Sequence, residues 1–307
     1  MAKIWEYNRG YAIARRYVDL CTRSCFRSVS IEGRELLPKD GAVILAPNHC
    51  CAMVDPMMVL LTEPGPVGFG ARSDIFAKPR TAAILRWLRI LPIARERNGL
   101  SEVAKNYAVF DEIVDCLAHD VPYCLYSEGM HRAERGMLPV KKGIFRVARL
   151  AVERLDKPVY VVPMGLDYEY FFRGQGRVAL RFGQAMNMTE IFAATAGRPE
   201  GEVYRELCTD LRERVLALLG RLPERRHDRR ALRALLGLVL LPLFLVCGAG
   251  SILIWLPHAI LVGRMKDKAW SHTVRYVLHL IFPIFWPFHI GFERMLNLYR
   301  NLFEDLS

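Results

Sequence analysis

The chain has 307 residues, enough for one large domain or two modest ones. Hydrophobic residues make up 52% of it, and 43 Lys and Arg against 32 Asp and Glu give a net charge of +11. Such a basic chain suits nucleic acid, an anionic membrane surface or an anionic substrate. Because no RNA-binding or zinc-finger pattern is present, nucleic acid is the least favoured of the three.

The N-terminal residues 4–26 alternate aromatic and apolar side chains with arginines, the pattern of a basic amphipathic helix. Such a helix either lies on an anionic membrane surface or packs on the core with its arginines solvated, and both readings stay open. We predict that residues 1–34 form a membrane-associated N-terminal helix.

Residues 35–220 show the rhythm of an α/β domain, in which short apolar runs alternate with helical segments. The expected strands are 28–32, 42–45, 67–71, 90–94, 123–126, 159–162 and 178–182. Residues 161–168 also read as a buried strand, with Pro163 in its middle. The expected helices are 56–61, 75–88, 100–118, 142–155 and 202–219. We predict a mixed, largely parallel sheet flanked by helices, with the functional site at the strand ends.

The C-terminal part, residues 221–307, begins with a basic linker and continues with hydrophobic segments. Its arginines stand at 221, 225, 226, 229, 230 and 233. Residues 234–263 then lack formal charges over a length that exceeds the roughly 20 residues needed to span a bilayer. Prolines and glycines interrupt this stretch, which favours a kinked span or a re-entrant hairpin. A second stretch, 276–292, is short, aromatic and interfacial in character. The alternative is a buried helical subdomain.

Cysteine usage predicts reduced thiols and a cytoplasmic catalytic domain. The eight cysteines are scattered without a Cys-x-x-Cys pair, and no histidine cluster has metal-ligand spacing, so we expect no metal and no cofactor. Cys50 and Cys51 follow His49 directly. A neighbouring cysteine cannot easily meet the ring of the adjacent histidine, so a thiol nucleophile is the less favoured alternative.

His49 and Asp55 are the predicted catalytic pair. His49 follows the expected strand 42–45, and Asp55 follows after a turn. The carboxylate can take one ring N–H of His49, which leaves the other nitrogen to accept a proton. Because no serine is nearby, the activated hydroxyl would belong to the substrate. The alternative is a loop histidine that forms its hydrogen bonds within the fold and has no catalytic role.

Two further groups of polar side chains follow expected strands. Arg95 and Arg97 follow the strand 90–94, where guanidinium groups suit phosphate, although solvated arginines are the alternative. Glu128 and Gly129 follow the strand 123–126, and Lys142 lies at the start of the next helix, a place that suits an anion.

Three blocks together resemble the glycerophospholipid (lysophosphatidate-type) acyltransferase family over about residues 30–190. They are Asn48-His49 with Asp55-Pro56, Ser127-Glu128-Gly129, and Val162-Pro163-Met164-Gly165. Five residues separate His49 from Asp55, a spacing similar to glycerol-3-phosphate or dihydroxyacetone-phosphate acyltransferases and their bacterial relatives, whereas most members have four. The family's usual Pro-Glu-Gly-Thr-Arg is here Ser-Glu-Gly-Met-His, so that His131 replaces the phosphate-holding arginine.

The resemblance implies acyl transfer from acyl-CoA or acyl-carrier protein, as a co-substrate, to a hydroxyl of glycerol-3-phosphate or lysophosphatidate. His49 would act as general base and Asp55 would orient it. Phosphate contacts are expected from Arg95, Arg97 and Arg132. The other expected substrate-binding residues are Asn48, Glu128, Gly129 and Lys142. Membrane lipids are the expected partners.

Two alternatives to this function remain open. The first is the same chemistry on a lyso-aminolipid or another lipid acceptor, which the replacement of arginine by His131 leaves open. The second is a catalytically silent lipid-binding membrane protein with the same fold, which the intact His49 and Asp55 disfavour.

Overall fold

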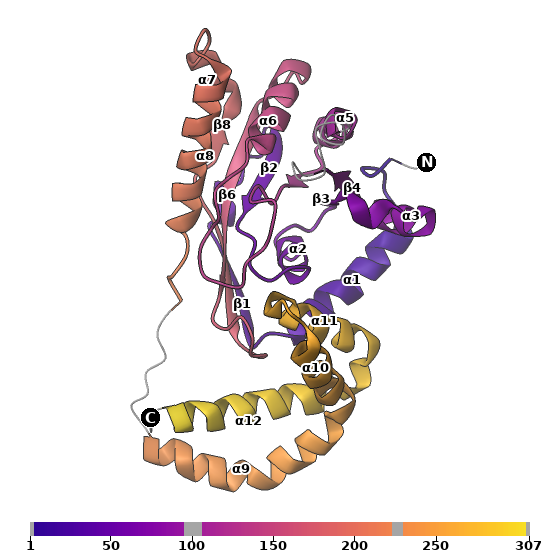
Figure 1. Cartoon of the computed structure of the whole chain (residues 1–307), viewed down its shortest axis with the longest axis vertical. Helices are drawn as coiled ribbons and strands as arrows, with labels where there is room; N and C mark the ends of the chain where they lie inside the picture. Colours follow the sequence, from indigo (N-terminus) through magenta and orange to yellow (C-terminus); the bar gives the residue numbers. More distant parts are fainter. Residues whose placement is uncertain (1–2, 95–105, 223–229, 305–307) are drawn as a thin grey trace.

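The computed structural model describes residues 3–94, 106–222 and 230–304, and within them one sheet organises the fold (Figure 1). Its strand order is β1-β7-β6-β2-β5-β3-β4, with β8 paired to β6. The strands are β1 (Ser28–Glu32), β2 (Ala42–Pro47), β3 (Gly68–Arg72), β4 (Ile90–Ile93), β5 (Tyr123–Cys124), β6 (Val159–Tyr168), β7 (Arg177–Phe182) and β8 (Met186–Asn187). Only the pairings of β6 with β7 and with β8 are antiparallel among these strands. The predicted mixed, largely parallel sheet is therefore confirmed.

Helices cover both faces of this sheet. One face packs on α5 (Asn106–Ala118), α6 (Gly143–Arg154), α7 (Met188–Ala194) and α8 (Glu200–Leu216). The other face packs on α1 (Arg9–Ser24), α2 (Val54–Leu60) and α11 (Ser271–Ile281), while α3 (Pro79–Trp87) precedes β4. Along β2, Ile44 and Leu45 point to opposite clusters, as the period of two in a strand requires. This burial on both faces explains why the parallel strands read as continuous apolar runs.

One strand joins two predicted segments, and two short elements were not predicted. The expected strands 159–162 and 161–168 form the single strand β6, because Pro163 keeps its register opposite Ala46 while residues from Met164 onward pair with β7. The short elements β8 and α7 were not predicted, since neither has a periodic apolar pattern long enough to stand out. The extension of β6 brings Tyr168 alongside the end of β2.

The C-terminal helices gather at one end of the molecule (Figure 1). They are α9 (Arg230–Gly250), α10 (Ile252–Arg264), α11 and α12 (Trp286–Glu304). No single helix in the described part of the chain is both long and apolar enough to cross a bilayer. The pair Ala234–Gly250 and Ile252–Arg264 meets both criteria only together, with a bend of 73° between them. Leu238, Val239 and Leu245 on α9 are each more than 60% exposed.

The second hydrophobic stretch, expected to be interfacial, is divided between two environments. In α11, Tyr276 and His279 are buried against the α/β domain, which contradicts an interfacial position for that helix. Ile281 and Ile284, which follow directly, are exposed. The subdomain alternative therefore describes α11, while α9 and α10 keep an exposed apolar surface.

Buried polar contacts dock α11 and α12 onto the sheet domain. Arg275 donates from Nε to Glu293 Oε1 at 2.8 Å and from Nη1 to His272 Nδ1 at 3.2 Å. His272 Nε2 in turn donates to the main-chain oxygen of Tyr170 at 2.8 Å. The Glu293 carboxylate occupies the place that a side chain at Gly174 would need. A glycine at 174 is thus a condition for docking.

Gly174→Ala should separate α12 from the domain. A Cβ built on Gly174 lies 1.5 Å from Glu293 Oε2, so the carboxylate must move and its buried ion pair with Arg275 is expected to break. Breaking a buried ion pair lowers the free energy of unfolding by about 3 kcal/mol or more. Thermal unfolding followed by circular dichroism measures the loss. Gly201→Ala, where nothing lies within 4 Å of the added carbon, is the control. Equal melting temperatures for the two variants would contradict this docking.

Candidate active site

His49 and Asp55 meet in the loop between β2 and α2. The chain leaves β2 at Pro47, turns through Ala52 with a left-handed φ of 47°, and enters α2 at Val54. This turn brings His49 Nδ1 to 2.7 Å from Asp55 Oδ2. Because the carboxylate accepts the Nδ1–H, neutral His49 carries its lone pair on Nε2. The predicted pairing of the two side chains is present in the structure.

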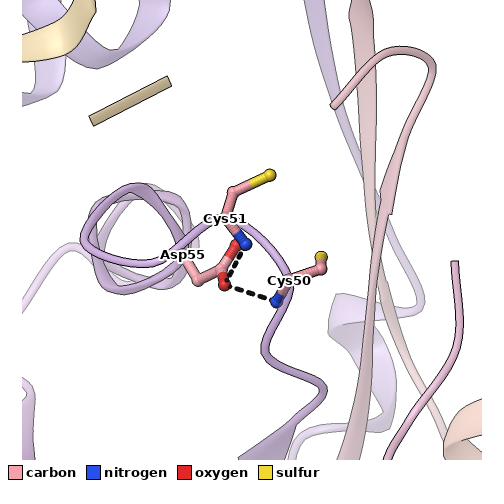
Figure 2. Close-up of side chains that lie close together, drawn as sticks. All are labelled: Cys50, Cys51 and Asp55. Carbon is pink, nitrogen blue, oxygen red and sulfur yellow. Dashed lines mark hydrogen bonds between the residues drawn. The ribbon is translucent and has the colours of Figure 1, made fainter. Parts of the chain in front are cut away.

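Asp55 is fully buried and accepts hydrogen bonds from four directions. Besides His49, the main-chain N–H groups of Cys50 and Cys51 donate to Oδ2, each at 2.8 Å (Figure 2). The Tyr168 hydroxyl donates to Oδ1 at 2.7 Å. Burial of a carboxylate is costly unless such donors replace its water, so these contacts hold Asp55 in one orientation.

The thiols of Cys50 and Cys51 lie close to Asp55, close enough for these three side chains to form a candidate metal-ligand group. Burial raises the pKa of both thiols, and that of Cys50 well above its ordinary value. A metal ligand or a nucleophile must be a thiolate, which these environments disfavour. In Figure 2 the dashed lines join the carboxylate to the main-chain nitrogens rather than to the sulfur atoms. The arrangement thus suits a held carboxylate better than a metal centre.

Asn48 holds the loop rather than a substrate. Its side chain is fully buried, accepts from the main-chain N–H of Leu166 at 2.7 Å and donates to the Leu166 oxygen at 3.1 Å. A further bond runs to the Gly136 oxygen at 3.2 Å. The predicted substrate contact is therefore wrong for this structure, because main-chain groups occupy the amide on both sides. Asn48 ties the start of the catalytic loop to β6.

Glu128 performs a similar task from the loop after β5. Its Oε1 accepts from the main-chain N–H of His49 at 2.6 Å, and its Oε2 accepts from that of Leu138 at 2.7 Å. Both oxygens therefore serve main-chain groups, in place of the predicted contact with an acceptor. Gly129 follows with a left-handed φ of 73°, a conformation that glycine adopts without strain. Burial raises the pKa of Glu128 to about 7.

The predicted basic residues differ in how they are placed relative to His49 and Asp55. Arg132 donates its main-chain N–H to the His49 oxygen at 3.1 Å, but its largely exposed side chain pairs with Glu134. Lys142 is exposed at the start of α6. Arg95 and Arg97 lie outside the described residues, so their predicted role stays a prediction.

Two tyrosines around His49 and Asp55 escaped the sequence analysis, and His131, which the sequence analysis named, lies beside His49. Tyr126 stacks on the His49 ring with 4.2 Å between centroids, and His131 meets it edge-on at 5.4 Å. Tyr168 is the donor to Asp55. Tyr126 and Tyr168 stand at the carboxyl ends of the strand segments that flank β2, a position that could have signalled them.

Residues 28–167 match the family model described as Acyltransferase. These residues form an acyltransferase domain. The match confirms the family predicted from the three motif blocks. Among solved structures, the chain is similar to the 1-acyl-sn-glycerophosphate acyltransferase PlsC from Thermotoga maritima, with 18% identity and a TM-score of 0.49. That alignment covers 71% of this chain and 86% of the other. No curated protein matches the sequence.

Tyr168→Phe should slow the acyltransferase while leaving its fold intact. Among the described residues Tyr168 is the donor to Asp55 Oδ1, so the change removes that hydrogen bond and the carboxylate gains freedom to turn away from His49. The loss of one hydrogen bond to a charged group lowers kcat by about tenfold. Steady-state kinetics measure this, with Tyr126→Phe for comparison, which keeps the ring on His49. A loss as large in Tyr126→Phe would contradict the special role of Tyr168.

Glu128→Gln should change how stability depends on pH. Burial raises the pKa of Glu128 from the ordinary 4.5 to about 7, so the folded chain holds this proton at pH values where the unfolded chain has released it. Its contribution to the free energy of unfolding is full below pH 4.5 and is lost as pH rises through 7. Glutamine does not titrate. The unfolding free energy of the parent minus that of the variant should therefore fall over this interval in denaturant titrations, and a constant difference would contradict the assignment.

Proposed function

We propose that the acyltransferase domain moves a fatty acyl chain from acyl-CoA or acyl-carrier protein to a hydroxyl of glycerol-3-phosphate or lysophosphatidate. The observation that carries this proposal is the 2.7 Å contact between His49 Nδ1 and the buried carboxylate of Asp55. It prepares Nε2 of His49 as a general base inside a domain of acyltransferase type.

Direct transfer without an acyl-enzyme follows from the groups in this loop. His49 Nε2 removes the proton of the acceptor hydroxyl, and that oxygen attacks the thioester carbonyl. When the tetrahedral intermediate collapses, the carbon–sulfur bond breaks and the thiolate takes the proton back from His49. Asp55 stabilises the imidazolium formed between these steps. Cys50 and Cys51 are buried thiols whose raised pKa values make them poor nucleophiles.

The acceptor's phosphate would be held by arginines, of which Arg95 is the first candidate. Arg132 is second, because its main chain already contacts the catalytic loop and its exposed pair with Glu134 exchanges easily for a phosphate. A lyso-aminolipid is the alternative acceptor. It stays open because His131, rather than the expected phosphate-binding arginine, stands near His49.

We further propose that the protein works at a membrane, with its catalytic domain on the cytoplasmic side. The apolar side chains of α9 and α10, including Leu238 and Val239, would lie in lipid rather than in water. Helix α1 packs on the core through Tyr11 and Cys21 yet exposes Ile13 and Leu20, and these two exposed apolar side chains support the proposal that the basic helix also lies on the membrane surface. A long-chain product would then pass directly into the bilayer.

His49→Ala should abolish transfer. Loss of a general base costs about 10²- to 10⁴-fold in rate. The assay uses labelled acyl-CoA, then acyl-carrier protein, with glycerol-3-phosphate, lysophosphatidate, dihydroxyacetone phosphate and a lyso-aminolipid as acceptors. The variant should still bind phospholipid vesicles as the parent does, which serves as the control for folding.

Each outcome of this assay bears on the proposal. Turnover with a phosphorylated glycerol, lost in His49→Ala, supports it in full. Turnover with the aminolipid alone keeps the mechanism and overturns the phosphate assignments. Absence of turnover with every pair, from protein that binds vesicles, overturns the enzymatic proposal in favour of a silent lipid-binding protein.

A further inference from the structure

The segment between α10 and α11 reaches His131, a neighbour of His49, although it lies about a hundred residues beyond the acyltransferase match. Asp267 Oδ2 accepts a hydrogen bond from His131 Nε2 at 2.9 Å. Trp270 meets the same imidazole edge-on, with 5.5 Å between ring centroids. His131 in turn is the ring that lies edge-on to His49. A side chain of the catalytic domain is thus oriented from the C-terminal part of the chain.

Asp267 is itself fixed where it stands. Its second oxygen, Oδ1, accepts the main-chain N–H of Ala269 at 2.9 Å and caps the short helical turn Lys268–Trp270. The carboxylate therefore has one oxygen for its own loop and one for His131. Because His131 donates from Nε2, its Nδ1 is the nitrogen left to meet a ligand.

The first turn of α11, which follows this segment directly, contacts the residue that supports Asp55. The ring of His272 stacks on Tyr168 at 6.0 Å between centroids, and Tyr168 donates to Asp55. His272 is held in turn by the Tyr170 oxygen and by Arg275. Residues 267–272 thus contact neighbours of both His49 and Asp55. These two contacts, one beside His49 and one beside Asp55, indicate that the segment is part of the site.

We propose that residues 267–272 complete the active site and that His131, oriented by Asp267, contacts the polar head of the acceptor. The acceptor hydroxyl must reach Nε2 of His49, so the rest of the acceptor lies beside that ring. Tyr126 covers one face of the ring, while the His131 side chain keeps 21% of its surface exposed at its edge. Nδ1 donates to an anion only when the ring is doubly protonated, and the imidazolium so formed, paired with Asp267, would bind a phosphate or carboxylate oxygen there.

This inference rests on the proposed acyl transfer, and it identifies the His131 imidazole as the group that recognises the polar head of the acceptor. Its position explains how a chain with histidine in place of the expected arginine could still recognise an anionic head. It also makes the exposed apolar helices part of the enzyme, because α10 leads directly into the loop that carries Asp267. The acceptor would then be bound between the catalytic domain and the lipid-facing segment.

The test is a cycle of His131→Ala, Asp267→Ala and the double variant in the full chain. With the acceptor that turns over, His131→Ala should raise the acceptor KM about tenfold, the effect of one lost hydrogen bond to a charged group. Asp267→Ala should raise it less, and the double variant should match His131→Ala, because Asp267 acts through His131. The KM for the acyl donor and kcat should change less than about twofold.

A second measurement separates this inference from the proposed function. Binding of labelled glycerol-3-phosphate and of lysophosphatidate is measured in a His49→Ala background, with and without Asp267→Ala. Weaker binding with Asp267→Ala supports the inference even if the parent transfers no acyl chain. Unchanged binding and an unchanged acceptor KM overturn it even if the parent is active. Additive effects in the double variant overturn the link between Asp267 and His131.

Asp210→Ala is the matched control. It removes another exposed aspartate that pairs with a basic side chain, Arg214, on the surface of α8. Its acceptor KM should equal that of the parent. Asp267→Asn retains an oxygen that accepts from His131 and should therefore fall between the parent and Asp267→Ala. Equal KM values for Asp267→Asn and Asp267→Ala would show that the charge, rather than the hydrogen bond, orients His131, and would overturn the geometry proposed.

Discussion

The buried carboxylate of Asp55 is the constraint on which the catalytic site depends. Removing a carboxylate from water costs several kcal/mol unless hydrogen bonds replace its hydration. Its donors come from separate parts of the fold: the loop after β2 supplies His49 and two main-chain N–H groups, and the end of β6 supplies Tyr168. The carboxylate is satisfied only when β2, α2 and β6 are assembled in register. The orientation of His49, the proposed general base, is therefore a consequence of the sheet being formed.

A second buried carboxylate, that of Glu128, orders the main chain in the same way. It joins the main-chain N–H of His49 to that of Leu138, so two loops at one edge of the sheet are held together. Asn48 adds a link from the catalytic loop to Leu166 on β6. These residues shape the site without facing a substrate. Polar side chains of a kind that often bind substrates can thus be needed to form hydrogen bonds with main-chain groups of a loop. A loop needs them because it has no regular main-chain hydrogen bonds of its own.

The C-terminal part of the chain combines two kinds of surface. Helices α11 and α12 are docked by a buried polar network that includes Arg275, Glu293 and His272, whereas α9 and α10 leave leucines and valines exposed. Polar contacts fix an orientation more strictly than apolar contacts do, because each has its own distance and angle. The exposed apolar surface of α9 and α10 can then be held in a defined position relative to the loop that carries His49. Residues 267–272 form the joint between these two surfaces.

The sequence by itself determined the α/β class, the main strands, the pairing of His49 with Asp55 and the acyltransferase family, because period-two burial and short motif spacings are local properties. It did not reveal Tyr168, Tyr126 or the contact of Asp267 with His131, which lie 113, 77 and 136 residues from their partners Asp55, His49 and His131. It also misassigned Asn48, since only the folded chain shows that Leu166 meets both ends of its amide. Local pattern decides which elements form. Tertiary packing decides which polar atoms those elements leave for a substrate, because hydrogen bonds between distant segments have no period along the chain.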